Sequence, residues 1–375
     1  MQTGSKQLMR DMSTTLVVRS ILKAGEISRA DISKELGLTK ATISAIVQTL
    51  IDRGIVLETG PAEALKGRKP ILLTLNRNCG YIISINIDFM SISVLVADIT
   101  GSSCAVRLFP NTYNEKQIVP AMKKLIRGLM AEQPESLFGL IGIVFGINGV
   151  THNGQIVFTP YYHYASIDFV SIFRKAFNVP VILENESNLS AIGEHTYCYP
   201  TRDIISISVH TGIGLGLILN GHLYTGHSGY AGEFGHTIVH PDGRPCPCGN
   251  KGCIEQYASE LAILRETAAR MKKDSVSADE FAKLYAEGNP IAVDEMNVFI
   301  RYMGIGINNI MNSFNPEIIV INSSFTMNCP DVITAIEGEL KNRMRHTCTI
   351  AASTLQDMAI LLGGVVLARN QFLGI

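Results

Sequence analysis

The feature that most constrains this chain is a group of three cysteines within eight residues, in the string C-P-C-G-N-K-G-C. Cys246, Cys248 and Cys253 share a loop whose two glycines permit sharp turns, so the three thiols can converge on one point. In a reducing compartment, thiols this close together serve better as metal ligands than as disulfides. His236, ten residues upstream, completes a Cys3His set, and His240 is the competing fourth ligand. The sequence therefore predicts one structural zinc ion (Zn2+) per chain, held by a loop over residues 236–255, with no coordination position left for a catalytic water.

Length and composition indicate a globular protein with more than one domain. The chain has 375 residues, of which 46% are hydrophobic and 17% charged, and single cores stop growing below this length. No run approaches the roughly 18 to 20 apolar residues that a membrane span requires. The first residues also lack the apolar stretch of a secretory signal. We expect a cytoplasmic protein that does not interact with a membrane.

The first 76 residues have the pattern of a small helical module that binds DNA. Up to Leu75 there are eleven basic and seven acidic side chains, a charge of +4, which leaves −5 for the remainder of a chain whose net charge is −1. A helix is predicted over residues 14–23, and Ser28 and Thr39 are placed to cap a second and a third helix. Residues 28–52 therefore have the spacing of a helix-turn-helix.

The third of these helices has one apolar and one polar face. The apolar side chains form a stripe that faces the core, and they are Ile43, Ile46, Val47 and Leu50. Two β-prone runs, 55–58 and 71–75, follow and predict a β-wing. The side chains expected to contact a double-stranded DNA operator, from the outer face of the helix and from the wing, are Thr39, Lys40, Ala41, Thr42, Ser44, Gln48, Arg68 and Lys69.

Beyond Asn76 the pattern changes to β-rich runs that alternate with helical ones, which is typical of an α/β fold. Two such series begin at Tyr81 and Ile204, and duplicated halves around a cleft would place a ligand between them. The predicted organisation is a DNA-binding domain over residues 1–76 and a ligand-binding domain over residues 77–375.

Residues 229–259, GYAGEFGHTIVHPDGRPCPCGNKGCIEQYAS, together with TGIGLGLILNG and ENESNLSAIGE before them, resemble the ROK family of repressors, open reading frames and kinases. The likeness spans nearly the whole chain, and the helix-turn-helix in front is similar to the branch of xylose and N-acetylglucosamine repressors. The resemblance implies a two-lobed, actin-like and hexokinase-like fold that binds a sugar in the interlobe cleft and forms a homodimer or homotetramer. The side chains that it places near the sugar are Asn148, Asn185, Glu186, Glu233, His236 and Glu255. His236 would bind zinc through one ring nitrogen and face the sugar with the other.

The residues that phosphoryl transfer requires in the family's kinases are altered here. The family's catalytic Asp follows the position of Asn185, where this chain has Glu186, whose extra methylene moves the carboxylate out of register. The first phosphate loop, D-x-G-G-T in the family, is replaced by Asn86, Asp88, Phe89 and Met90, and its acidic and two bulky side chains would repel a nucleotide and fill its space. The family's later nucleotide-binding glycine cluster is replaced by Asn322, Ser323 and Ser324. The second phosphate loop, residues 211–216, is retained in outline. We expect a protein that is not an enzyme, and the alternative is an active ATP-dependent ROK sugar kinase with an added DNA-binding domain.

The expected function is repression of a carbohydrate-utilisation operon. A sugar or sugar phosphate bound in the cleft would favour a conformation that binds the operator weakly. Xylose, glucose, N-acetylglucosamine and their phosphates are all compatible with these motifs, because side-chain placement on a very fine scale decides sugar stereochemistry. Regulation through another protein, such as a component of a sugar transporter, is a further alternative.

Overall fold

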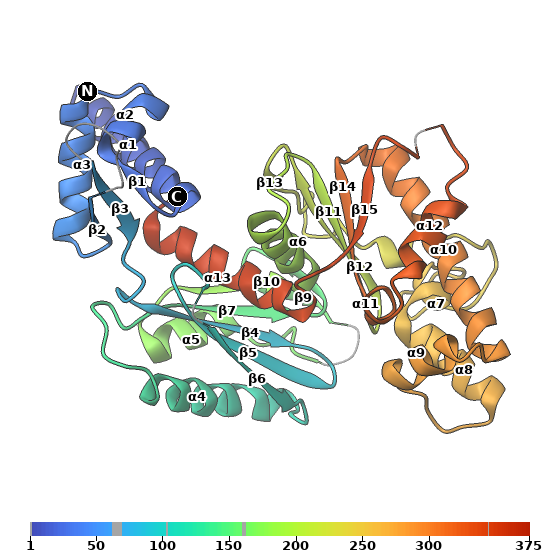
Figure 1. Cartoon of the computed structure of the whole chain (residues 1–375). Coiled ribbons are helices and arrows are strands. Elements are labelled where there is room, and N and C mark those ends of the chain that lie inside the picture. Colours follow the sequence, from blue (N-terminus) through green and yellow to red (C-terminus); the bar gives the residue numbers. More distant parts are fainter. Residues whose placement is uncertain (1, 62–69, 103, 160–162, 344) are drawn as a thin grey trace.

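The computed structural model describes residues 2–61, 70–102, 104–159, 163–343 and 345–375, which form a head and two lobes (Figure 1). The elements of the head are α1 (Gln2–Ala24), β1 (Ile27–Ser28), α2 (Arg29–Leu36), α3 (Lys40–Asp52), β2 (Val56–Pro61) and β3 (Ile71–Leu75). Its three strands form an antiparallel sheet in the order β1-β3-β2. The predicted winged helix-turn-helix is confirmed, with two differences: α1 begins long before residue 14, and β1 was not expected.

Local sequence explains where the helices of the head begin and end. The Ser28 hydroxyl accepts a hydrogen bond from the backbone N–H of Asp31 at 3.2 Å, and the Thr39 hydroxyl accepts one from the backbone N–H of Thr42 at 3.2 Å. Gly37 ends α2 in the left-handed conformation, at φ 65°. The predicted stripe of α3 is buried, so this helix presents its other face outward.

The first lobe is built on a five-stranded sheet in the order β10-β7-β4-β5-β6. Its elements are β4 (Tyr81–Ile87), β5 (Ser91–Asp98), β6 (Cys104–Pro110), α4 (Glu115–Ala131), β7 (Leu140–Ile147), β8 (Val150–His152), β9 (Gln155–Phe158), α5 (Phe169–Phe177), β10 (Val181–Asn185) and α6 (Glu186–Tyr197). Strands β4, β7 and β10 are parallel, so their carboxyl ends meet at one edge, beside the second lobe.

The second lobe repeats this plan with a sheet in the order β13-β12-β11-β14-β15. Its elements are β11 (Ile204–Val209), β12 (Ile213–Leu219), β13 (His222–Leu223), the 3-10 helix η1 (Phe234–His236), α7 (Glu255–Ala258), α8 (Glu260–Met271), α9 (Ala278–Ala286), α10 (Pro290–Phe314), β14 (Ile318–Asn322), α11 (Ser324–Asn328), α12 (Asp331–Glu339) and β15 (Thr349–Ala352). The two expected series of strands are therefore two lobes, which begin at Tyr81 and Ile204.

Helices α6 and α13 (Asp357–Leu373) lie between the two sheets and pack closely on each other (Figure 1). A Cβ added at Gly363 would lie 1.9 Å from the Leu189 carbonyl oxygen, and one added at Gly193 would lie 2.1 Å from the Ala359 carbonyl oxygen. Glycine at these positions allows the two helix backbones to approach each other. Helix α6 begins at the cleft between the lobes, and Asp357 at the start of α13 acts electrostatically on Glu186 there. We call this pair of helices the hinge of the body.

The far end of α13 contacts the head. The Thr15 hydroxyl of α1 donates a hydrogen bond to the Gly374 carbonyl oxygen at 2.9 Å. Beside it, the ring of Phe372 meets that of Phe138, in the first lobe, edge to face at 5.2 Å. One buried apolar cluster extends from Val17 of α1 to Val365 of α13. The chain segment near Asn76 therefore separates two units in sequence that share one core in space. Within the described part of the chain, no helix combines the length and the apolar character that crossing a bilayer requires.

Candidate metal cluster, ligand cleft and DNA-binding face

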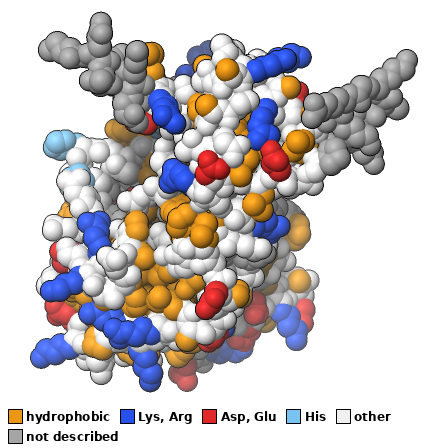
Figure 2. Space-filling view, turned by 90° about the vertical axis from the view of Figure 1, so that its left-hand side faces the viewer, with side chains coloured by type: hydrophobic (Ala, Val, Ile, Leu, Met, Phe, Trp, Pro, Cys, Tyr) orange, Lys and Arg blue, Asp and Glu red, His pale blue; other side chains and the backbone are white. Residues whose placement is uncertain are grey.

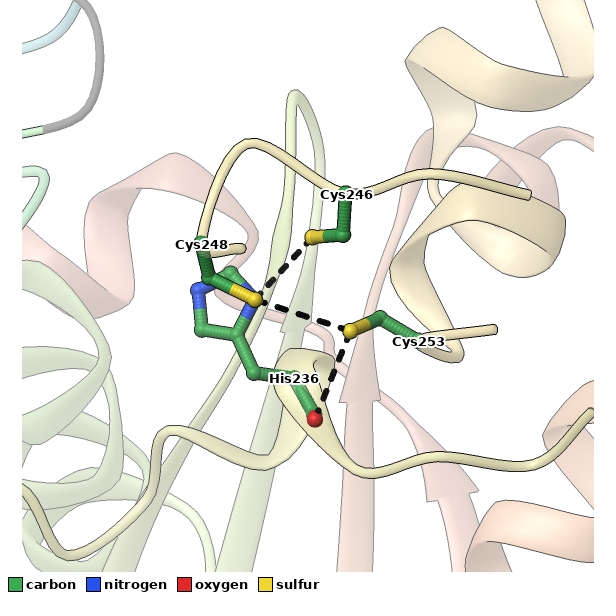
Figure 3. Close-up of side chains that lie close together, drawn as sticks. All are labelled: His236, Cys246, Cys248 and Cys253. Atoms are coloured by element: carbon green, nitrogen blue, oxygen red, sulfur yellow. Dashed lines mark hydrogen bonds between the residues drawn. The ribbon is translucent and has the colours of Figure 1, made fainter. Parts of the chain in front are cut away.

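The metal-binding residues predicted from the sequence come together in the second lobe. Ligand atoms of His236, Cys246, Cys248 and Cys253 all lie within 4.8 Å of one another (Figure 3). The Cys246 Sγ lies 3.5 Å from the His236 Nδ1, and the Cys248 and Cys253 sulfurs lie 3.7 Å apart. Burial raises the pKa of the Cys246 thiol, an effect that a bound cation would oppose. A tetrahedral set of one imidazole and three thiols fits a structural metal ion.

The competing ligand, His240, faces away from this cluster. Its Nδ1 lies 3.2 Å from the Pro241 carbonyl oxygen, and its ring stacks on Tyr257 at 5.9 Å. A Cβ added at Gly252, whose φ is +81°, would lie 1.7 Å from the His240 carbonyl oxygen. Glycine at position 252 therefore allows the cysteine loop to turn and to pack against the backbone of His240.

A cleft of about 730 Å³, open to solvent, lies between the two lobes. All six polar side chains that were predicted to lie near the sugar line it, and they are Asn148, Asn185, Glu186, Glu233, His236 and Glu255. Asn148 follows β7, and Asn185 and Glu186 mark the junction of β10 with α6, so these three come from the first lobe. The other three come from the second lobe, around the metal cluster. The structure thus brings all of the predicted sugar-contacting residues into one cavity.

His236 connects the metal cluster to the cleft. Its Nδ1 faces the thiol of Cys246 and lies 3.6 Å from the Glu255 Oε1, while its Nε2 lies 3.7 Å from the Glu233 Oε2. Burial raises the pKa of the Glu233 carboxyl, and the charge of Glu255 adds to this, although His236 opposes both. A metal at the cluster would fix the orientation of the imidazole ring and so of the carboxylates beside it.

The sequence analysis did not predict several residues that line the cleft. Ser208 and His210, at and just beyond the end of β11, line it, and the carboxylates of Glu260 and Asp357 act on His210 from behind. The sequence did contain a signal for His210, because it directly precedes the glycine-rich loop of residues 211–216. The sequence contains no comparable signal for Glu260 and Asp357, because they begin helices far along the chain.

The two bulky residues of the altered phosphate loop do not line this cleft. Phe89 and Met90 lie in the turn between β4 and β5, where 41% and 69% of their surfaces are exposed, and Phe89 borders a different cavity. Asp88 remains relevant through its charge, which raises the pKa of the Glu186 carboxyl. Neither bulky side chain enters the sugar cleft, and their interference with a nucleotide stays a prediction.

The DNA-contacting residues predicted on α3 are all exposed. They are Thr39, Lys40, Ala41, Thr42, Ser44 and Gln48, whereas Arg68 and Lys69 lie outside the described residues. The Gln48 Nε2 donates to the Asp52 Oδ1 at 2.8 Å, so this amide must exchange an intrahelical bond before it contacts a base. Figure 2 shows basic side chains at several places on this side of the molecule, with acidic ones between them rather than one continuous basic patch.

Comparisons with known proteins agree with this architecture. The ROK family model matches residues 82–371, and a winged helix-turn-helix DNA-binding model matches residues 15–56. The xylose repressor of Bacillus spizizenii is 34% identical over 383 residues, which cover 100% of this chain and 99% of the relative.

Solved structures share the fold. A ROK family transcriptional regulator, described as a homologue of the Escherichia coli MLC protein, has 24% identity and a TM-score of 0.84, with 97% of this chain and 98% of that chain covered. A ROK family glucokinase from Streptomyces griseus, solved with glucose and AMPPNP, has 25% identity and a TM-score of 0.70, with 78% of this chain and 100% of that chain covered. Since the family model matches most of the chain and a curated member aligns with it from end to end, this protein belongs to the ROK family.

Proposed function

We propose that this chain is a transcriptional repressor whose affinity for its DNA operator is controlled by a sugar bound in the interlobe cleft. The observation that carries the proposal is the end-to-end alignment with a xylose repressor, which includes both the winged helix-turn-helix and the cleft. The exposed polar face of α3 suits insertion into the major groove. The carboxylates and amides of the cleft suit recognition of sugar hydroxyls. The regulated genes would be those of carbohydrate utilisation.

The metal that we propose for the cysteine cluster is a structural zinc ion, one per chain. The donor set of one imidazole and three thiols supports this choice, because zinc favours nitrogen and sulfur ligands in a tetrahedral arrangement. When bound, the ion supplies no chemistry to the sugar, since four protein ligands fill its coordination shell. His236 and Glu255 would hold their orientation toward the cleft only in the loaded protein.

The second candidate function is that of an ATP-dependent sugar kinase. The likeness to the glucokinase favours it, but the glycines of residues 211–216 have a packing reason that requires no nucleotide. A Cβ added at Gly214 would lie 2.2 Å from the Ser187 Oγ, and one at Gly216 would lie 2.1 Å from the Ser187 carbonyl oxygen. Together with Glu186 in the place of the family's catalytic Asp, this favours a regulator that is not an enzyme.

Helix α13 supplies a physical connection from the cleft to the head. Its first residue, Asp357, acts electrostatically on Glu186 and His210, and the carbonyl oxygen of Gly374 at its other end accepts the hydrogen bond from Thr15 of α1. A sugar that closes the lobes would move α13 and with it α1. In a homodimer or homotetramer, the two heads that grip a palindromic operator would then change their spacing. A coupling free energy of about 1 to 3 kcal/mol would change operator affinity roughly 5- to 150-fold.

The DNA-binding half of the proposal is tested with operators that the purified protein selects from random duplexes. Gln48→Ala or Thr42→Ala should relax the preference of the protein for these duplexes over scrambled ones, since both side chains lie on the exposed face of α3. Lys283→Ala, at an exposed position of α9, is the matched control. Unchanged affinity and preference in both head variants would place the DNA-binding surface elsewhere.

A further inference from the structure

The hinge side of the cleft contains buried polar atoms that make no contact within the described protein. Ser208 is only 3% exposed and lines the cleft, yet its Oγ has no hydrogen-bond partner among the described residues. The Nε2 of His210, which also lines the cleft, has none either. Buried polar groups without partners cost free energy. We call Glu186, Ser208 and His210 the hinge subsite.

A carboxylate lies near one nitrogen of the His210 ring. Its Nδ1 lies 4.0 Å from the Glu260 Oε1, and this same oxygen accepts hydrogen bonds from the Ser323 Oγ at 2.8 Å and the Ser324 backbone N–H at 2.6 Å. With Glu260 on the Nδ1 side of the ring, the Nε2 of His210 is the nitrogen that is left without a described hydrogen-bond partner. Ser208 and His210 together present a hydroxyl and an imidazole nitrogen side by side along one strand end.

The charge around the hinge subsite is negative. Asp88, Glu186, Glu260 and Asp357 surround a single imidazole, and none of the described residues that line the cleft is Lys or Arg. Burial opposes protonation of His210, but the four carboxylates raise the pKa of its ring. Even with His210 protonated, carboxylates outnumber cations in this subsite.

At the helix starts beside this subsite, backbone donors that could bind an anion are already in use. Helix α6 begins at the cleft, but the Asn185 side chain accepts the hydrogen bonds from the backbone N–H groups of Ser187 and Asn188, at 2.7 and 3.2 Å. The N–H of Ser324, at the start of α11, is bound to Glu260. An anion would have to displace these acceptors to reach a helix N-terminus.

From these observations we infer that the hinge subsite hydrogen-bonds a hydroxyl of an uncharged sugar and rejects sugars that carry a phosphate or carboxylate. The inference rests on the proposed function and narrows its effector class from sugars and sugar phosphates to unphosphorylated sugars. Ser208 and His210 supply the hydrogen bonds, and Glu186 supplies the repulsion.

The test is isothermal titration of the full-length, metal-loaded protein with matched pairs of probes. The pairs are D-xylose and its pyranose 1-phosphate, D-glucose and its 6-phosphate, and N-acetyl-D-glucosamine and its 6-phosphate. At least one unphosphorylated sugar should bind, and its phosphate should bind about a hundredfold more weakly. A phosphate that binds as tightly as its parent sugar would overturn the inference and leave the proposed function intact, whereas binding of none of the six would overturn both.

Two variants test which residues of the hinge subsite bind the sugar and which reject its phosphate. Ser208→Ala should weaken binding of the unphosphorylated sugar about tenfold, and Glu186→Gln should reduce the discrimination against its phosphate about tenfold at about pH 8. Glu287→Gln, at the exposed C-terminal end of α9, is the matched carboxylate control. Unchanged sugar affinity in Ser208→Ala, with unchanged discrimination in Glu186→Gln, would contradict the role of the hinge subsite even if the wild-type protein prefers unphosphorylated sugars.

Discussion

The two sides of the cleft contain the same kinds of side chain under different constraints. On the metal side, His236 lies within 4 Å of two carboxylates and of the Cys246 thiol, so an ion at the cluster would fix the ring and its neighbours together. On the hinge side, His210 also faces carboxylates, of which Glu260 accepts hydrogen bonds from the start of α11. The Ser208 Oγ and the His210 Nε2, in contrast, have no hydrogen-bond partner among the described residues. With an ion bound at the cluster, similar residues would form a rigid wall on one side of the cleft and a wall that can respond to a ligand on the other.

The difference explains how a sugar-binding fold can serve as a sensor. A ligand changes a conformational equilibrium only through interactions that differ between the two states. The hinge side has such interactions to offer, because closing the lobes on a hydroxyl would satisfy buried polar atoms. It also lies where α6 and α13 begin, and α13 extends to the head. The metal side would keep its geometry in both states.

Loss of a metal ligand should have the largest effect, and it tests the rigid wall. Cys248→Ser should reduce the metal content from one ion per chain to near zero and the free energy of unfolding by about 4 kcal/mol, because the ion organises residues 236–255. Elemental analysis and thermal unfolding provide the measurements, with the exposed Cys104→Ser as control. Full metal content and unchanged unfolding in Cys248→Ser would show that this thiol is not a ligand.

A substitution at the contact of α6 with α13 should disturb the responsive wall alone. Gly363→Ala places a Cβ against the Leu189 carbonyl oxygen, and overpacking of this kind costs about 1 to 3 kcal/mol. Gly128→Ala is the control, since a Cβ at this exposed position of α4 meets no atom within 4 Å, and it should be neutral or slightly stabilising. Metal content should stay at one ion per chain in both variants. If Gly363→Ala unfolds like wild type, the two helices are less tightly coupled than their geometry indicates.

The smallest effect should be a change in the pH dependence of stability caused by Glu186. Burial and the nearby Asp88 raise the pKa of this carboxyl from 4.5 to about 7. The folded state then binds more protons than the unfolded state between these values, so stability falls as pH rises through this range, and the cost is complete above it. Glu186→Gln should raise the Tm by about 2 °C at about pH 8, of the order of 1 kcal/mol, and by less at about pH 5. An equal change at both pH values would mean that the charge of Glu186 is not responsible.

Sequence reasoning succeeded where the signal was local. Hydrophobic periodicity and capping residues gave α2 and α3, and the spacing of Cys246, Cys248 and Cys253 gave the metal cluster. Strand β1 was missed because two residues carry no periodicity, and it forms only by pairing with β3. The residues around His210 were only partly predicted, for a similar reason. The end of β11 meets the starts of α8 and α13 only in the folded protein.

The shared core of the head and the first lobe was also invisible in the sequence. The composition changes near Asn76, which indicates a boundary, but the packing of Val17 and Ile21 on the cluster that contains Val365 depends on a helix more than 300 residues away. Long-range packing of this kind has no local sequence signal. It is nevertheless the contact on which the proposed communication between cleft and DNA depends.

The most direct test of this account is the sugar dependence of operator binding. Fluorescence anisotropy would follow the binding of a selected operator duplex to the metal-loaded protein, with and without a saturating concentration of the unphosphorylated sugar that binds best in the titrations above. We expect the sugar to weaken operator binding by a factor within the roughly 5- to 150-fold range of typical allosteric coupling, and Ser208→Ala to shift that response to higher sugar concentration. Operator affinity that is the same with and without a bound sugar would contradict the claim that the cleft controls the head.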